Sequence, residues 1–201
     1  MTESPLKVLR LTGAQPELSR WLSALAALRI RVFRDFPYLY DGSLEYEESY
    51  LKTYTECPES IVVLVLDGDA VVGATTGLPL AAETEEFKRP FVAAGIAPED
   101  IFYCAESVLL PEYRGQGLYK RFFLEREGQA SALGGFTHTS FCCVQRPADH
   151  PLRPADYRPL DAVWRHFGYT PRADLMTTYP WQDIGEAEET DKPMMFWLKP
   201  L

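Results

Sequence analysis

The sequence SVLLPEYRGQGLYKRFF occupies residues 107–123 and joins an apolar strand, a proline, a glycine-rich turn and the start of an amphipathic helix. Gly115 and Gly117 lack a Cβ, so the backbone there can adopt unusual conformations and approach a ligand closely. Such a turn leaves backbone N–H groups unpaired at the helix N-terminus, where the helix dipole favours an anion. Arg114 adds a positive charge at the same turn. The sequence therefore predicts a site for a phosphate or pyrophosphate.

The spacing of the glycines excludes two common phosphate-binding motifs. A Walker-type loop needs four residues between its glycines, followed by Lys and Ser or Thr, and none of these is present. A Rossmann fingerprint needs a third glycine where Lys120 stands. A bare G-x-G is weak evidence, so the longer string has to identify the ligand.

That longer string resembles the acyl-CoA-binding segment of the GCN5-related N-acetyltransferases (the GNAT family). Their motif, Arg/Gln-x-x-Gly-x-Gly/Ala, follows a hydrophobic strand and Pro-Glu-Tyr; Arg114, Gly117 and residues 109–113 match it. Tyr119 stands where the family usually has Gly or Ala, so we expect an altered fit around the pyrophosphate. The resemblance implies acetyl-CoA as cofactor. The residues it implies for cofactor binding are Val108, Leu109, Leu110, Arg114, Gly115, Gln116, Gly117, Leu118 and Tyr119.

Apolar periodicity predicts the other elements. We expect strands at 6–11, 61–66, 70–76, 101–110, 136–144, 175–179 and 194–199. We expect helices at 16 to about 36, 44–56, 83–94, 118–133 and 160–167. Their order is similar to that of the GNAT fold over essentially the whole chain. The resemblance implies an α/β (α+β) class, with a mixed, mostly antiparallel sheet of about seven strands flanked by helices and acyl-CoA in a central cleft. We expect one domain, residues 1–201.

Composition limits the partners and the compartment. A net charge of −9 argues against a nucleic-acid partner and against docking on anionic membranes. No apolar run approaches a membrane span, and residues 1–4 do not read as the start of a signal peptide. The histidines are scattered, so no metal site is expected, and a homodimer is left open. Buried free thiols in a reducing cytoplasm are expected at Cys57, Cys104, Cys142 and Cys143.

The resemblance also implies direct transfer of an acyl group to an amine within a ternary complex, which needs a base and an acid. Glu106 is the candidate base, because many family members carry a carboxylate near this point; alternatively it faces solvent or pairs with an arginine. The family's acid is commonly a tyrosine four residues before the glycine of a Gly-Phe pair. Gly168 begins the corresponding pair here, and Trp164 stands at the tyrosine position.

An indole N–H does not donate a proton in this pH range, so another group has to serve as the acid. Tyr157 is the first candidate. Water-assisted departure of the thiolate and a loss of catalysis are the alternatives.

The resemblance places the acceptor between the first two helices and the last strands. The candidate substrate residues there are Arg34, Tyr38, Tyr40 and Arg146. Arginines in the proline-rich insert 146–158 would suit a carboxylate or phosphate, whereas the acids Glu45, Glu47 and Glu48 would suit a polyamine. Both charge groups could instead be solvated surface. A small primary amine, such as an amino acid or its derivative, is expected.

The expected function is therefore transfer of an acetyl group from acetyl-CoA to a small-molecule amine. A non-catalytic acyl-CoA-binding or sensing module of the same fold is the main alternative. A structural protein without cofactor and a transferase for longer acyl chains are the others, and the room beside Tyr119 and Trp164 would decide the acyl length.

Overall fold

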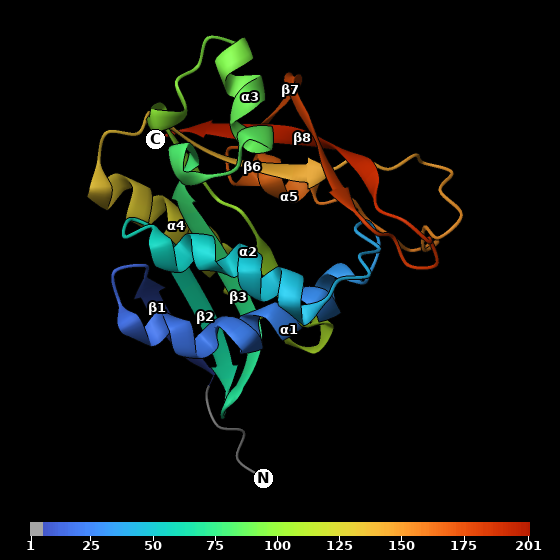
Figure 1. Ribbon diagram of the computed structural model, residues 1–201, viewed down its shortest axis with the longest axis horizontal. Helices are drawn as coiled ribbons and strands as arrows, with labels where there is room; N and C mark the ends of the chain where they lie inside the picture. Colours follow the sequence, from blue (N-terminus) through green and yellow to red (C-terminus); the bar gives the residue numbers. More distant parts are fainter. Residues whose placement is uncertain (1–5) are drawn as a thin grey trace.

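One sheet of eight strands organises the protein, in the order β1-β2-β3-β4-β6-β8-β7, with β5 pairing β3 (Figure 1). The strands are β1 (Lys7–Thr12), β2 (Ile61–Asp67), β3 (Ala70–Pro79), β4 (Ile101–Tyr103), β5 (Ser107–Leu109), β6 (His138–Val144), β7 (Thr170–Trp181) and β8 (Thr190–Pro200). The pairings are antiparallel except between β4 and β6. This computed structural model describes residues 6–201, so residues 1–4, read above for a signal peptide, lie outside the described residues.

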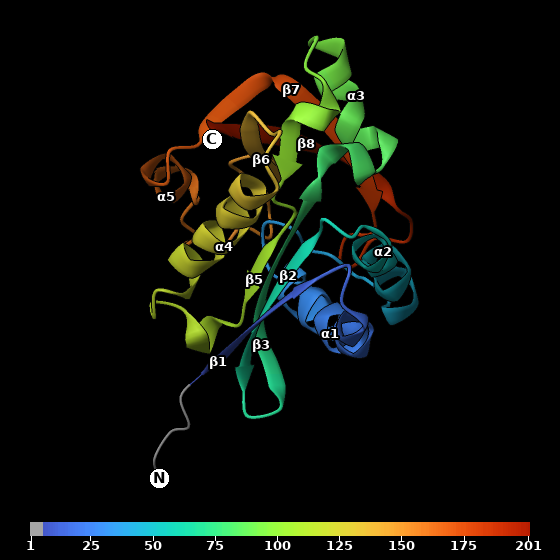
Figure 2. The same ribbon diagram turned by 90° about the vertical axis from the view of Figure 1, so that its left-hand side faces the viewer.

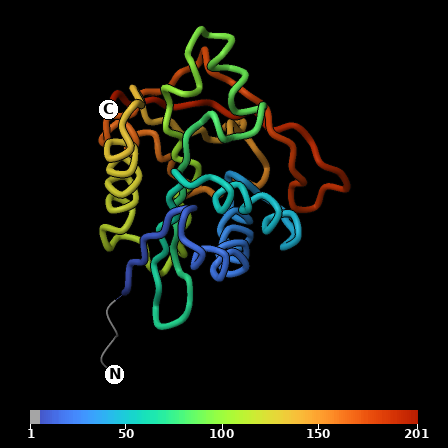
Figure 3. The backbone as a smooth tube through the Cα atoms, turned by 60° about the vertical axis from the view of Figure 1, so that its left-hand side comes forward, coloured from blue at the N-terminus to red at the C-terminus, as the bar shows by residue number. Residues whose placement is uncertain are grey.

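Helices cover both faces of the sheet (Figure 2). They are α1 (Leu22–Phe33), α2 (Leu44–Glu56), α3 (Glu85–Ala93), α4 (Leu118–Leu133) and α5 (Asp161–His166). Helices α1 and α2 lie together against one face of β1–β3, and α4 lies against the other. The connection between β7 and β8 extends away from the body of the molecule (Figure 3).

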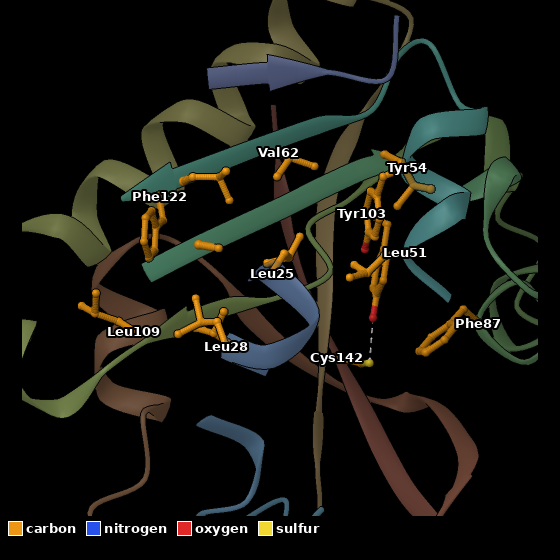
Figure 4. Close-up of a cluster of buried hydrophobic side chains, with 14 of the residues drawn as sticks. Leu25, Leu28, Leu51, Tyr54, Val62, Phe87, Tyr103, Leu109, Phe122 and Cys142 are labelled. Carbon is orange, nitrogen blue, oxygen red and sulfur yellow. Dashed lines mark hydrogen bonds between the residues drawn. The ribbon is translucent and has the colours of Figure 1, made fainter. Parts of the chain in front are cut away.

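The central strand β2 shows why the sheet is covered on both sides. Its first six residues, IVVLVL, are all buried, as expected for a strand with helices on both faces. Val62 packs in the cluster that contains Leu25 and Leu51, on the side of α1 and α2 (Figure 4). Ile61, whose side chain points to the opposite face, packs in a second cluster with Phe123 of α4.

Two predicted elements are confirmed closely. The helix expected at 44–56 is α2, and the Ser43 hydroxyl caps it by accepting a hydrogen bond from the Tyr46 amide at 3.3 Å. The hairpin is β2–β3, where Asp67 pairs with Ala70 around a two-residue loop. Gly68, with φ of 57°, takes the first loop position, which in a type II′ turn requires glycine.

Other boundaries differ from the sequence-based expectation. The single strand predicted over 101–110 is two strands, β4 and β5, so the sheet has eight strands rather than about seven. The helix predicted from residue 16 begins as a 3-10 segment, Pro16–Trp21, before α1. The strand predicted at 175–179 extends over Thr170–Trp181, with a register shift between Arg172 and Met176.

Three further observations concern residues 6–201. No helix in this part of the chain combines the length and the apolar character needed to cross a membrane. Within the same residues, no group of three or more His, Cys, Asp or Glu side chains is arranged to hold a metal ion. The four cysteines are free, and Cys143 is half-buried whereas the other three are buried.

Candidate active site

The break between β4 and β5 opens the sheet beside the glycine turn. Strand β4 pairs with β6 in parallel, and just after it the Cys104 amide donates to the Ser140 carbonyl at 2.6 Å. From Ala105 onward the chain follows β3 instead, with the Ala105 amide donating to the Thr76 carbonyl at 3.1 Å. In the described part of the chain β5 pairs only β3. The other edge of β5 is thus free to hydrogen-bond an extended ligand.

The turn after β5 presents an open surface. Gly115 and Gly117 both have φ of 79°, a conformation that residues with a Cβ rarely adopt. A Cβ added at either glycine would meet no atom within 4 Å, so these glycines are not required by internal packing. Gly117 is the N-cap of α4; no side chain caps this end, and its first turn carries no acidic residue. The positive end of the helix therefore faces outward uncompensated.

Arg114 ties this turn to β5. Its Nε lies 3.3 Å from the Leu109 carbonyl oxygen and donates a hydrogen bond to it. Residues 114–117 are exposed, whereas Leu118 and Tyr119 are half-buried. The three strand positions expected to bind cofactor, Val108, Leu109 and Leu110, have buried side chains, so they can offer a ligand only their backbone.

A hydrogen bond joins the first turn of α4 to α5. The indole Nε1 of Trp164 donates to the Tyr119 phenolic oxygen at 2.9 Å. The Tyr119 ring also packs edge-on against Phe123, with 5.2 Å between centroids. Burial raises the pKa of the Tyr119 phenol, so this group is protonated at neutral pH.

Glu106 belongs to a buried ion cluster of three residues. Its Oε2 lies 2.6 Å from Nη1 of Arg29, and Nε of Arg29 donates to Oε2 of Glu47 at 2.5 Å. The three side chains are at most 10% exposed. The guanidinium also lies over the rings of Phe33 and Tyr50, at 5.1 and 4.9 Å from their centroids. Glu106 is therefore held in place, and its Oε1 has no hydrogen-bond partner within residues 6–201.

A cavity of about 100 Å³ opens next to this cluster. Its walls come from α1, α2, the loop after α1, α3, and strands β4 to β8, so it lies where the first helices meet the last strands. Tyr38 and Tyr40 line it, as does Glu106. Tyr103 forms part of the wall, and its hydroxyl lies 3.0 Å from the Cys142 sulfur (Figure 4).

The loop that carries Tyr38 is fixed by Arg146. Arg146 donates to the Pro37 carbonyl (Nε) and the Tyr38 carbonyl (Nη2), each at 2.8 Å. It also makes a two-pronged ion pair with Asp183, at 2.7 and 2.8 Å. Between these anchors, Leu39 has φ of 55°, which is strained for a residue with a Cβ. The clamp thus determines where the Tyr38 ring enters the cavity.

Three expected site residues lie away from the cavity. Arg146 does not line it, because its guanidinium is used internally; its role is positioning rather than the direct substrate contact expected from the sequence. Arg34 is exposed and pairs with Asp41 at 2.8 Å. Tyr157 packs edge-on against Phe36, at 4.7 Å between centroids, and beneath Arg153. Among the candidates for substrate contact, the cavity brings together Tyr38 and Tyr40 with Glu106.

Sequence reasoning missed Arg29 and Glu47. A signal for the first was present: Arg29 follows Leu22 and Leu25 at seven and four residues, on the apolar stripe of the helix. A charged residue on a core-facing stripe needs a buried partner. Nothing in the pattern of α2 singles out Glu47 from the other acids beside it.

Comparison with solved structures shows the fold. The chain is similar to a Desulfovibrio desulfuricans protein assigned to the GNAT family (10% identity, TM-score 0.56, 98% of this chain and 99% of that one). It is also similar to a ribosomal-protein-alanine N-acetyltransferase from Brucella melitensis (15%, TM-score 0.59, 97% and 99%). An acyl-CoA N-acyltransferase from Pseudomonas aeruginosa gives 15%, TM-score 0.56, and the same coverage.

The protein therefore has the GNAT fold, with the mixed, mostly antiparallel sheet that the resemblance of residues 107–123 implied. No protein-family model matches the chain. No curated protein sequence matches it significantly.

Proposed function

We propose that this protein is an acyl-CoA-dependent N-acyltransferase that moves an acetyl group from acetyl-CoA to a primary amine of a small molecule. One observation carries the proposal: a strand edge without a partner runs from an open glycine turn toward a cavity that contains a buried carboxylate. The turn suits a pyrophosphate, the edge suits an amide-containing arm, and the carboxylate suits an amine.

The chain's own groups fit this cofactor. The N–H groups of residues 115–119 and the positive end of α4 would hold the pyrophosphate, with Arg114 fixing the turn. The backbone of Val108, Leu109 and Leu110 would hold the pantetheine arm and offer an N–H to the acyl oxygen. Acetyl-CoA supplies the acyl group as a thioester when it is bound.

Glu106 is proposed as the base. Its carboxylate lines the cavity and takes a proton from the amine nitrogen, directly or through one water. The ion pair with Arg29 orients the carboxylate, and the free Oε1 retains the capacity to accept a proton or a hydrogen bond. The sequence alternative, pairing with an arginine, is thus realised together with the proposed role rather than instead of it.

We propose Tyr38 as the acid, in preference to Tyr157. Tyr38 lines the same cavity as Glu106, and its hydroxyl has no hydrogen-bond partner in the described part of the chain. Burial raises the pKa of the Tyr38 phenol, and the thiols of Cys142 and Cys143 raise it further. The phenol therefore holds its proton until a thiolate leaves beside it.

A non-catalytic acyl-CoA-binding module is the second candidate. The observation that favours it is Trp164, an indole that cannot act as an acid, at the position where the family commonly has tyrosine. This module would use the same turn and strand edge, and it would not need Tyr38.

The experiment that tests the proposal is calorimetric titration of the purified protein with acetyl-CoA and with free CoA, followed by a thiol-release assay over pooled amines. Binding with thiol release supports the transferase. Binding without release over the pool supports the non-catalytic module. No binding of either ligand contradicts both proposals and leaves residues 114–119 as an ordinary turn.

A further inference from the structure

The chemistry of the cavity beside Glu106 can be read from its walls. Nine of its fifteen lining residues are aromatic, among them Phe33, Tyr38, Tyr50, Phe87 and Trp181. The volume of about 100 Å³ lies between the ~30 Å³ of one water molecule and the ~150 Å³ of an apolar cavity that holds benzene. Tyr46 and Tyr179 meet at their hydroxyls, 2.9 Å apart, and are also lining residues. The cavity therefore suits a compact apolar group.

Its charges leave no cation for a ligand. Arg29 is the positive lining residue, and both of its partners, Glu47 and Glu106, also line the cavity. Its edge is paired with the two carboxylates, and two aromatic rings lie against the guanidinium. The three groups sum to one negative charge, and Oε1 of Glu106 is an acceptor without a donor.

No other Lys, Arg or His lines the cavity in the part of the chain that the structure describes. Arg34 points its charge at Asp41 on the surface, and Arg146 is saturated by Asp183 and two carbonyls. A ligand carboxylate or phosphate would thus be desolvated next to Glu106 without a partner, which is costly.

A polyamine is not favoured either. A second ammonium group needs a second free carboxylate, and Glu47 is already paired with Arg29. Glu45 is exposed, and Glu48 accepts a hydrogen bond from Ser23 at 2.5 Å, so neither supplies an anion inside the cavity.

We propose that the acceptor is a small primary amine carried on an aromatic or short aliphatic body without a carboxylate or phosphate; this inference rests on the proposed acyltransferase function. The ammonium form is attracted by the aromatic walls and by Glu106. During transfer the amine nitrogen bonds to the acyl carbon as the C–S bond breaks. Glu106 receives the proton that nitrogen loses, and the departing sulfur receives one from Tyr38.

The test compares molecules that share a body and differ in charge. Thiol release from acetyl-CoA is measured with 2-phenylethylamine, with phenylalanine, which adds only a carboxylate, and with spermidine. We expect kcat/KM for 2-phenylethylamine to exceed both others by at least ~10-fold, since about 1.4 kcal/mol of unpaired charge suffices for that ratio. Equal or better use of phenylalanine or spermidine would overturn the inference.

A binding experiment separates this inference from the proposed function. The protein without acetyl-CoA is titrated calorimetrically with 2-phenylethylamine and with 3-phenylpropionate, and only the amine is expected to bind. If the amine binds and acetyl-CoA does not, the proposed function fails and the cavity assignment stands. If neither aromatic compound binds, or only the carboxylate does, the assignment is wrong whatever acetyl-CoA does.

A substitution at Glu47 gives a change in selectivity. Glu47→Gln leaves one side of Arg29 without its carboxylate, so the ratio of kcat/KM for phenylalanine to that for 2-phenylethylamine should rise by ~10-fold. Glu45→Gln, on the exposed side of the same helix, is the control and should leave the ratio unchanged. An unchanged ratio in a Glu47→Gln variant with native circular dichroism would overturn the charge argument, and the binding comparison decides if that variant does not fold.

Discussion

The indole nitrogen of Trp164 donates a hydrogen bond to the phenolic oxygen of Tyr119 across 2.9 Å, from α5 to the first turn of α4. Both residues depart from the GNAT pattern: Tyr119 replaces a glycine or alanine and Trp164 replaces a tyrosine. The structure joins the two departures, so a bulky residue on α4 is matched by a donor on α5. We infer that neither position can return to the family residue alone without cost.

A double-mutant cycle tests this coupling. Trp164→Phe removes the donor and Tyr119→Phe removes the acceptor, and each should lower the free energy of unfolding by about 1 kcal/mol, the net worth of one hydrogen bond. Because both substitutions remove the same bond, the double variant should lose less than the sum of the two. Urea unfolding monitored by circular dichroism measures the three values. Additive losses would contradict the coupling.

Gly117→Val should abolish most of the affinity for CoA. The branched side chain would enter the open surface in front of the α4 N-terminus, and we expect the Kd from calorimetry to rise by more than ~10-fold. Gly134→Val is the matched control, because Gly134 ends the same helix with φ of 72° and also has open surroundings. Both variants carry similar backbone strain, so wild-type CoA affinity in a folded Gly117→Val protein would disprove the cofactor site.

Glu106→Gln should lower kcat and leave acetyl-CoA binding nearly unchanged. Loss of a general base typically costs about 10²–10⁴ in rate, and the amide keeps the shape of the side chain. The variant's rate should also lose the wild-type dependence on pH between 6 and 9. Rates at several pH values, with calorimetry as the binding control, check this. A pH profile and kcat equal to those of the wild type would remove Glu106 from the mechanism.

Two phenol-to-phenyl substitutions identify the acid. Tyr38→Phe should reduce kcat by about 10²-fold, whereas Tyr157→Phe should change it by less than about threefold, because only Tyr38 shares the cavity with Glu106. Acetyl-CoA affinity should be retained in both. The reverse order of effects would restore Tyr157, and small effects in both would leave protonation of the thiolate to water.

Glu83 predicts a pH dependence of stability. Burial raises its pKa from 4.5 to about 7, so between these values the folded state holds a proton that the unfolded state has lost. Stability therefore falls as pH rises through this window, by about 3 kcal/mol. Glu83→Gln cannot ionise and should remove this loss, so relative to the wild type it gains stability at pH 8 over pH 4.

Denaturation curves at the two pH values measure the effect. Glu85→Gln, at a side chain that is 84% exposed, is the control and should shift nothing. The assignment to Glu83 is wrong if its variant and the wild type lose stability equally across the window.

Local signals were sufficient for much of the fold. The Ser43 cap, the Asp67-Gly68 turn and the glycine turn before α4 each depend on residues close in sequence, and each element is where the pattern predicted it. The break between β4 and β5 was missed because nothing within 101–110 marks it. It arises where the chain exchanges β6 for β3 as its neighbour, which is a tertiary event.

The same limit applies to the site. Tyr38, Tyr40 and Glu106 could be grouped by analogy, and the cavity does bring them together. Arg146 was assigned to the substrate because a pattern shows that an arginine is present but not what satisfies it; here the partner, Asp183, is 37 residues away. The cluster of Arg29, Glu47 and Glu106 joins three elements, so no single stretch of sequence contains it.

The clamp on the Tyr38 loop has a consequence for protein synthesis. The Tyr38 carbonyl is held by Arg146 and also by the indole of Trp181, groups that emerge from the ribosome 108 and 143 residues after it. A nascent chain can fold α1, α2 and the β2–β3 hairpin early, but its strained loop has no anchors until β7 has been made. The acceptor side of the site is thus among the last parts to form, and incomplete chains should be unable to use an amine even when their glycine turn is already built.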